Sequence, residues 1–156
     1  MPILAKLREC LDRSGVPYEV TSHRQAFTAQ EVAQAEHIPG KDLAKVVMLR
    51  SGKNFCMIAL PAPYRVDLER AKKALGLAEI ALATEEEFAG LFPQCEAGAM
   101  PPFGNLYGLP VYVDESLTKD DSIVFNAGNH TQTVKMKYAD FVRVVQPKVV
   151  SVAARH

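Results

Sequence analysis

The first hydrophobic pattern in the chain is that of an amphipathic helix. Apolar residues recur at intervals of three and four between Ile3 and Leu11, which predicts a helix that Gly15 ends. Thr28 and Glu31 have the spacing of a capping box, in which each side chain bonds the other residue's backbone at a helix start. The expected helices span residues 2–14, 28–35, 67–75, 84–91 and 138–145.

Apolar runs bounded by turn residues predict the strands. The clearest run extends over 43–50, and after a Ser-Gly-Lys-Asn turn a second run over 55–60 completes a hairpin. Because helices and strands interleave without a strict βαβ repeat, we expect an α/β (mixed α+β) fold with a mixed, largely antiparallel sheet. A single domain over residues 1–156 is expected. The other expected strands span residues 17–20, 79–83, 109–113, 123–125, 131–137 and 149–152.

Composition narrows the class of protein. The 156 residues include 18 basic and 18 acidic side chains, so the formal net charge is zero and a protein that coats duplex DNA is not expected. A nucleic-acid end held in a local pocket stays compatible with that charge. No apolar run is long enough for a membrane span, and the N-terminus lacks a signal-peptide pattern. Cys10, Cys56 and Cys95 fit neither a disulfide framework nor a metal spacing, so we expect a cytoplasmic protein without a metal.

Lys45 is the first candidate for chemistry. It lies in an apolar strand whose two faces both look covered, so its ammonium group is expected to be partly desolvated. A buried ammonium needs an anion or another acceptor, and a polar ligand could supply one. The alternative is a lysine whose head group reaches water at the sheet edge.

A second candidate is the proline-rich loop over residues 98–105. Pro101 and Pro102 fix the backbone, and Gly98 and Gly104 on either side permit close approach to a ligand, with Phe103 between them. This loop is either the wall of a pocket or an ordinary connection between elements.

The turn over residues 126–131 presents His130, which either lies at the mouth of a site or is exposed in a turn. Asp114 and Glu115 end a strand and could act as an acid/base pair, but solvated turn residues are the commoner role of such pairs.

Taken together and in order, these segments resemble the YbaK / prolyl-tRNA-synthetase-associated domain family. The resemblance covers nearly the whole chain, and its specificity comes from the combination, since no single motif is diagnostic. The segments that carry it are residues 28–33 (TAQEVA), 43–47 (LAKVV), 98–104 (GAMPPFG), 109–117 (LPVYVDESL) and 126–131 (NAGNHT).

The resemblance implies a sheet curled around a pocket and a free-standing deacylase that edits mischarged tRNA in trans. The reaction is hydrolysis of the ester that joins an amino acid to the terminal adenosine of the tRNA, which is of the proline type or a related one. By the same resemblance, Lys45 lies near the ester and terminal nucleotide, Gly98 holds the aminoacyl group with its backbone, and His130 lies on the pocket rim as the third catalytic residue. The remaining substrate-binding residues are expected to be Pro101, Pro102, Phe103, Gly104 and Gly128.

No cofactor is expected, because an activated ester needs little beyond orientation, backbone donors and one positioned water. The expected partner is the acceptor end of a mischarged tRNA, gripped by Phe103 and by Lys41, Arg50 and Lys53. An aminoacyl-tRNA synthetase as a transient partner is left open, and no membrane is expected.

Val46 departs from one branch of the family, because free-standing alanine-specific editors tend to have Asn after the lysine. Alanine specificity is therefore in doubt, and serine, threonine, cysteine or a non-protein amino acid stays open. Two other classes of function also stay open. One is a non-catalytic module that binds a tRNA 3′ end or a synthetase, and the other is an esterase for a small aminoacyl metabolite.

Overall fold

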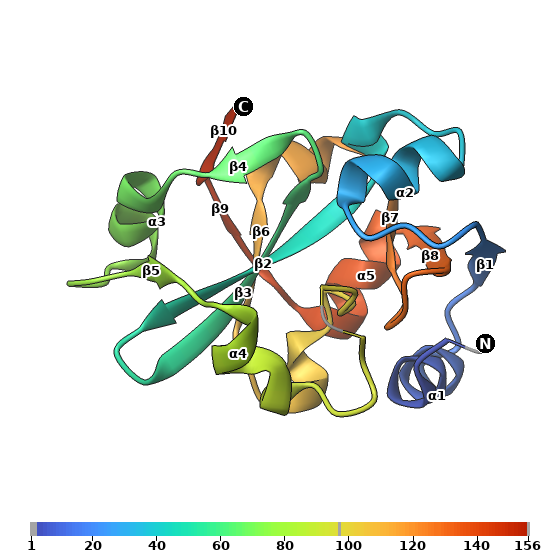
Figure 1. Ribbon diagram of the computed structural model, residues 1–156, viewed down its shortest axis with the longest axis horizontal. Helices are drawn as coiled ribbons and strands as arrows, with labels where there is room; N and C mark the ends of the chain where they lie inside the picture. Colours follow the sequence, from blue (N-terminus) through green and yellow to red (C-terminus); the bar gives the residue numbers. More distant parts are fainter. Residues whose placement is uncertain (1–2, 97, 156) are drawn as a thin grey trace.

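The computed structural model describes residues 3–96 and 98–155, and its helices and strands interleave as the sequence predicts (Figure 1). The α-helices are α1 (Ala5–Ser14), α2 (Ala29–Ala35), α3 (Leu68–Leu75), α4 (Glu85–Phe88) and α5 (Tyr138–Val145). The strands are β1 (Tyr18–Ser22), β2 (Ala44–Ser51), β3 (Asn54–Pro61), β4 (Tyr64–Val66), β5 (Ala81–Leu82), β6 (Val111–Asp114), β7 (Ser122–Asn126), β8 (Gln132–Lys137), β9 (Lys148–Val150) and β10 (Ala153–Arg155). Short 3₁₀ helices are η1 (Gly40–Asp42), η2 (Ala89–Leu91), η3 (Gly104–Tyr107) and η4 (Glu115–Lys119).

The capping box before α2 is confirmed. The backbone N–H of Glu31 donates to Thr28 Oγ1 at 3.1 Å, and the N–H of Thr28 donates to Glu31 Oε1 at 3.2 Å. The same reciprocal pair opens α4, and the Asp67 carboxylate caps α3. These caps satisfy N–H groups that the first helical turn leaves without partners.

The structure departs most from the prediction in three segments. β4, at residues where no strand was expected, forms directly after the Pro-Ala-Pro segment over 61–63, because it pairs with β10 alone and needs few ladder bonds. In place of one strand over residues 149–152, the structure has β9, which pairs with β6, and then β10 beyond residue 152, which pairs with β4. The helix expected over residues 84–91 is one turn of α-helix followed by η2.

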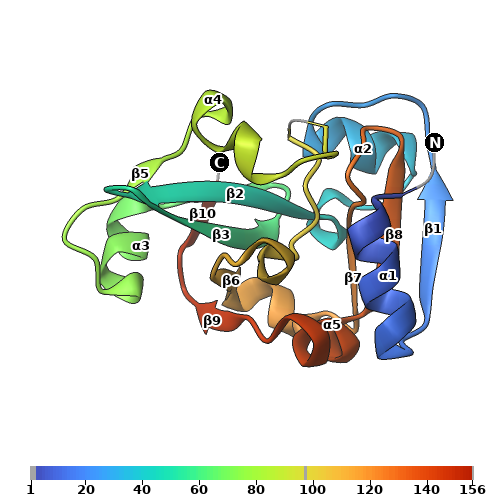
Figure 2. The ribbon, with the colours of Figure 1, turned by 90° about the horizontal axis from the view of Figure 1, so that it is seen from below.

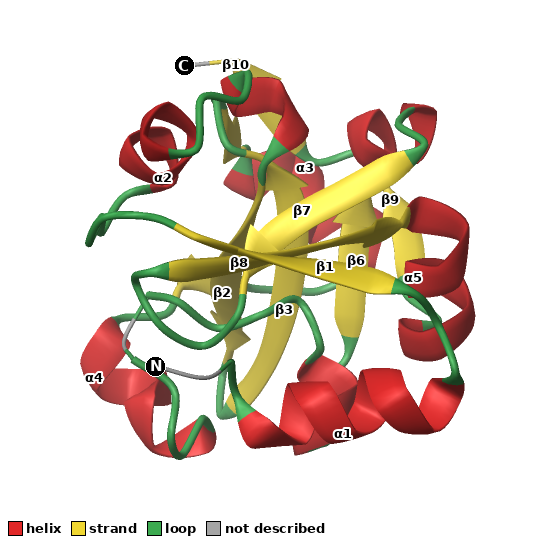
Figure 3. Ribbon diagram, turned by 90° about the vertical axis from the view of Figure 1, so that its right-hand side faces the viewer, coloured by secondary structure: helices red, strands yellow, loops and turns green. Residues whose placement is uncertain are grey.

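The strands form three sheets. The largest has the order β5-β2-β3-β6-β9, antiparallel through β5, β2 and β3 and parallel from β3 to β9. Strands β1, β8 and β7 form an antiparallel second sheet, which crosses in front of the first in Figure 3, and a parallel bridge between Leu43 and Val124 joins the two. The mixed α+β prediction is therefore confirmed, with the strands divided among separate sheets.

An aromatic cluster fills the core between the two larger sheets. The ring centroids of Phe103, Phe125 and Phe141 lie 5.4–6.4 Å apart, and all three side chains are fully buried. Leu7 and Leu11 of α1 close this core from one end. Burial of each such side chain contributes about 1.5–3 kcal/mol, so this cluster is a main source of stability.

The central hairpin β2–β3 is covered on both faces, as its apolar sequence predicts (Figure 2). Met48 and Met57 face the aromatic core together with Phe88 of α4, whereas Leu49 and Ile58 face a second cluster that includes Leu68 and Leu75 of α3. Within the part of the chain that the structure describes, every helix is too short or too polar to cross a bilayer.

Candidate functional site

Most of the proline-rich loop is buried. Pro101, Pro102, Phe103 and Gly104 all lie in the interior, and a Cβ at Gly104 would come within 2.9 Å of Val111 Cγ2. Phe103 has no exposed surface, which corrects the expectation that its ring grips a nucleotide. Instead, this segment anchors the loop, and Gly98 is the part that reaches the surface.

The structure brings Gly98 and His130 together. Gly98 has φ +81°, a backbone conformation in which any residue with a side chain is strained. A Cβ built at Gly98 would lie 3.8 Å from His130 Cε1. The His130 side chain is 8% exposed, so its ring forms a wall of the space beside Gly98. A small group of a ligand that occupied this space would contact both the loop backbone and the imidazole.

Gly128 joins the two loops that carry these residues. Its N–H donates to the Ala99 carbonyl at 2.9 Å, and its own carbonyl accepts from the Glu96 N–H at 2.8 Å. It has φ +99°, and a Cβ would lie 2.8 Å from Leu4 Cβ, so the close packing of the chain before α1 requires glycine here. The structure therefore gives Gly128 a framework role beside the site, where the sequence had suggested contact with substrate.

Two carboxylates flank the same space. Glu96 Oε2 lies 3.8 Å from His130 Nε2, and Glu85 Oε1 would lie 3.6 Å from a Cβ at Gly98. They give this part of the site a negative character, which favours a positively charged group on a ligand.

Phe27 covers the other side of His130. The two ring centroids are 4.8 Å apart with an interplanar angle of 51°, and Phe27 is 60% exposed. Phe27 was not among the predicted site residues, although it lies directly before Thr28, the residue that caps α2.

Lys45 lines a cavity that is separate from the space beside Gly98 and His130. It shares the α3-facing side of β2 with Val47 and is paired across the hairpin with Leu60, whereas the Gly98 loop packs on the opposite side. Burial lowers the pKa of its ammonium group, so the expected partial desolvation is confirmed. The cavity measures about 520 Å³, and its other lining residues are Val47, Arg65, Val66, Asp67, Leu68, Glu69 and Leu82.

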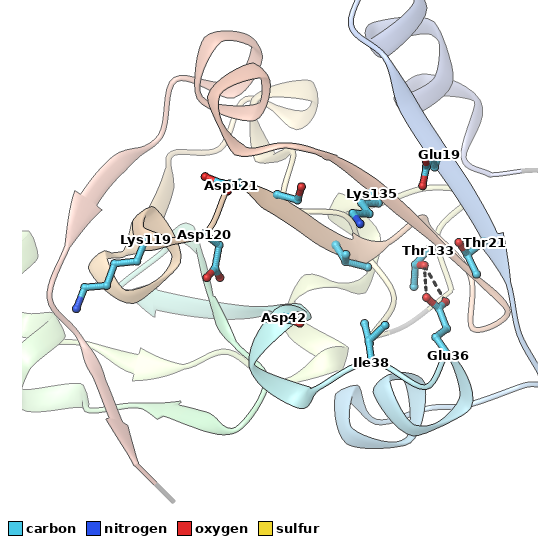
Figure 4. A pocket seen from close by; sticks show the side chains of 12 residues that line it. Glu19, Thr21, Glu36, Ile38, Asp42, Lys119, Asp120, Asp121, Thr133 and Lys135 are labelled. Atoms are coloured by element: carbon cyan, nitrogen blue, oxygen red, sulfur yellow. Dashed lines mark hydrogen bonds between the residues drawn. The ribbon is translucent and has the colours of Figure 1, made fainter.

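A third cavity, also about 520 Å³, lies between β1, β8 and the end of α2 (Figure 4). At its floor Thr133 Oγ1 donates to both carboxylate oxygens of Glu36, at 2.8 and 2.7 Å, and His23 Nε2 lies 3.5 Å from Glu36 Oε2. Burial raises the pKa of Glu36, against the opposing effects of Thr133 and His23. The other charged residues of the lining are Glu19, Asp42, Asp120, Asp121, Lys119 and Lys135.

Five carboxylates against two lysines make this third cavity unsuited to a phosphate backbone, which is bound through positive charge. No local sequence pattern predicts this cavity, because its lining comes from segments that are far apart along the chain. Its distinctive interior group is the His23–Glu36–Thr133 cluster. Among residues 3–96 and 98–155, no group of three or more His, Cys, Asp or Glu side chains is arranged to hold a metal ion.

Comparison with known proteins points to one class of activity. The family model described as "Aminoacyl-tRNA editing domain" matches residues 23–144. The chain is 28% identical over 151 residues to the "Multifunctional Ser/Thr-tRNA deacylase ProXp-y" of Escherichia coli strain K12, covering 94% of this chain and 90% of that protein. The same protein from Escherichia coli O157:H7 matches equally well.

Two crystal structures share the fold. One, of a hypothetical protein, has a TM-score of 0.86 at 16% identity and covers 96% of this chain and 99% of its own. The other, of a protein proposed to be a trans-editing enzyme for prolyl-tRNA synthetase, has a TM-score of 0.83 at 22% identity and covers 96% of this chain and 95% of its own.

Proposed function

The chain belongs to the aminoacyl-tRNA editing domain family, and from this premise we propose that it is a free-standing deacylase that hydrolyses mischarged tRNA in trans. The substrate bond is the ester between the amino acid and the terminal ribose, and the tRNA is of the proline type or a related one. Supporting this proposal, the family match spans the segments that contain Lys45, Gly98 and His130. We place the reaction in the cytoplasm, in keeping with Cys10, Cys56 and Cys95 being free thiols.

We propose serine and threonine as the amino acids removed. The name of the Escherichia coli relative supports this choice, because it describes a Ser/Thr-tRNA deacylase. A cavity of about 60 Å³ beside Glu96 has room for a side chain of only a few atoms, as this choice requires. Its lining residues are Phe88, Ala89, Phe92, Cys95, Glu96 and Met100.

The pair of Gly98 and His130 is the single observation that carries the proposal. The ester carbonyl lies in the space between them, with the rigid backbone at Gly98 holding the aminoacyl group and His130 positioning the attacking water. Glu96, 3.8 Å from His130 Nε2, holds the imidazole in place. No strong nucleophile is needed, because the ester is already activated and orientation supplies much of the rate.

Lys45 acts in binding in this proposal. Its cavity also contains Arg65, and two carboxylates, Asp67 and Glu69, balance these two cations. Because the Asp67 carboxylate is engaged as the cap of α3, Lys45 and Arg65 are the groups proposed to contact a phosphate of the acceptor strand. The position of Lys45 on the α3-facing side of β2 supports a contact with the nucleic acid more than one with the attacking water.

A deacylation panel tests the proposed function. Wild type, Lys45→Ala and His130→Ala are assayed on tRNAs mischarged with serine, threonine, cysteine and alanine, with exposed Lys148→Ala as the matched control for loss of a lysine. We expect hydrolysis of the seryl or threonyl ester by wild type and by Lys148→Ala, and loss of most activity in the other two variants. Tight tRNA binding without hydrolysis would instead identify a binding module. Turnover of free aminoacyl esters without tRNA would identify an esterase.

A further inference from the structure

Phe27 is an exposed aromatic side chain at the edge of the site. It is 60% exposed, the highest value among the large hydrophobic side chains that the structure describes as exposed, and the others in that set are aliphatic. A single exposed hydrophobic residue is ordinary on a protein surface. Phe27 differs because of what holds it and what lies beneath it.

The backbone around Phe27 is fixed on both sides. Ala26 is buried, and its N–H donates to the His130 carbonyl at 3.1 Å, while the His23 N–H donates to the Thr131 carbonyl at 2.8 Å. On the other side Thr28 begins α2 through its capping box with Glu31. The backbone that carries the ring is therefore fixed relative to His130, and the ring packs against the imidazole in the absence of a ligand.

Only the His130 ring separates the Phe27 ring from the proposed reaction centre. Its centroid is 4.8 Å from that of His130, and His130 Cε1 is 3.8 Å from the point where Gly98 would carry a Cβ. In a charged tRNA the ester and the terminal base are attached to the same ribose. A substrate whose ester lies between Gly98 and His130 therefore has its base within reach of Phe27.

We infer that Phe27 is the platform on which the terminal adenine of the tRNA stacks. The inference rests on the proposed function and names the residue that holds the base. Proteins grip single-stranded ends by stacking bases on aromatic rings, which needs no specific hydrogen bonds. Phe103, the aromatic residue that the sequence suggested for this contact, is wholly buried and has no ring face to offer.

The test measures KM and kcat for the charged tRNA that wild type hydrolyses, with Phe27→Ala, Phe27→Leu and Phe27→Trp. Val149→Ala, at a comparably exposed residue of β9 (54%), is the control for loss of surface hydrophobicity. We expect Phe27→Ala to raise KM roughly 5- to 150-fold, the equivalent of one lost stacking contact. We expect Phe27→Leu to behave like Phe27→Ala, Phe27→Trp to restore a KM near wild type, and Val149→Ala to be unchanged.

A second substrate separates stacking from a structural role. On the same charged tRNA lacking its terminal base, Phe27→Ala should raise KM less than about twofold over wild type, because the contact is already absent. An unchanged KM for Phe27→Ala on the complete substrate, restoration by Phe27→Leu, or an equal loss on both substrates would each overturn the inference while the deacylase function stands. If wild type hydrolyses no charged tRNA, the proposed function fails and the inference fails with it.

Discussion

Gly98 has a left-handed backbone, φ +81°, next to His130. A side chain in that conformation costs about 1–2 kcal/mol wherever it occurs. At Gly98 it would also occupy the space that we assign to the ester, because its Cβ meets His130 Cε1 and Glu85 Oε1 at contact distance. Backbone strain and loss of function can therefore be separated at this residue.

We expect Gly98→Ala to lower the free energy of unfolding by about 1–2 kcal/mol and to reduce kcat/KM at least tenfold. Gly76→Ala is the matched control, because Gly76 has φ +67° at the end of α3 with no other heavy atom within 4 Å of its Cβ position. Urea denaturation should show similar losses of stability for both variants, and deacylation should fall in Gly98→Ala alone. Equal activity of the two variants would remove the loop from the site.

The Lys45 side chain makes stability depend on pH. Burial disfavours its charged form, so the pKa is lowered from 10.5 and the unfolded chain binds more protons between the lowered pKa and 10.5. The destabilisation is complete below the folded-state pKa and is relieved as pH rises through it. Lys45→Met should therefore be more stable than wild type at neutral pH, and this advantage should shrink as pH approaches 10.5.

Urea denaturation at several pH values checks this expectation for Lys45. Lys53→Met, in the exposed turn between β2 and β3, is the control for loss of one positive charge. An advantage of Lys45→Met that grows with pH would contradict the assignment.

Among the helices and strands, Asp114 links the end of β6 to β10. It is 2% exposed, and its Oδ1 accepts from the N–H groups of Val152 and Ala153, both at 2.9 Å. Its Oδ2 accepts from the N–H and the hydroxyl of Ser116. Burial alone would raise the pKa of Asp114, but these hydrogen bonds outweigh it and lower the pKa below 3.8.

We expect Asp114→Asn to lower the free energy of unfolding by about 1–3 kcal/mol at neutral pH. Because the folded-state pKa is depressed, the contribution of the carboxylate is present above pH 3.8 and is lost as pH falls through the folded-state value. The two proteins should therefore converge in stability in acid. Exposed Asp121→Asn is the control, and a gap of constant size across the acid range would show that charge is not the cause.

Phe103 connects the proline-rich loop to the core. Its ring lies 5.4 Å from Phe125 and 5.6 Å from Phe141, centroid to centroid. We expect Phe103→Ala to lower the free energy of unfolding by about 3–5 kcal/mol, because the cavity cannot collapse among rigid aromatic neighbours. Phe103→Leu should lose less than half as much, and a loss below about 1 kcal/mol for Phe103→Ala in urea denaturation would contradict this anchoring role.

Element prediction succeeded where local chemistry decides the outcome. The capping residues placed the starts of α2, α3 and α4, and the apolar runs placed β2 and β3. It failed where distant segments decide. β4 exists because β10 pairs with it, and Asp114 is buried and hydrogen-bonded because Val152 and the first residue of β10, Ala153, present their N–H groups to it. Neither partner is visible in a local window of sequence.

The same limit applies to the candidate site. His130 and Gly98 could be picked out because turn glycines and a histidine stand out in sequence, and their proximity is an observation of the structure. Phe27 and Phe103 could not be told apart, because both are aromatic residues in irregular segments. Burial alone distinguishes them, at 60% and 0% exposure.

For the whole molecule, the zero net charge predicts weak salt dependence. With 18 basic and 18 acidic residues and a third cavity rich in carboxylates, few phosphates can be neutralised on binding. For about one or two phosphate contacts, raising the salt concentration fourfold should lower kcat/KM by less than roughly tenfold. A steeper loss in a salt titration would reveal a larger basic footprint than the structure has.

Backbone hydrogen bonds join the loops of the site to one another. The N–H groups of His23, Ala26, Glu96 and Gly128 donate to the carbonyls of Thr131, His130, Gly128 and Ala99. Every residue type has a carbonyl and every type except proline has an N–H, so side chains at the positions that do not require glycine can be exchanged without breaking these hydrogen bonds. Substitutions in these loops can therefore change substrate preference during evolution while the fold is retained. The same property makes the protein a starting point for engineering new ester selectivities.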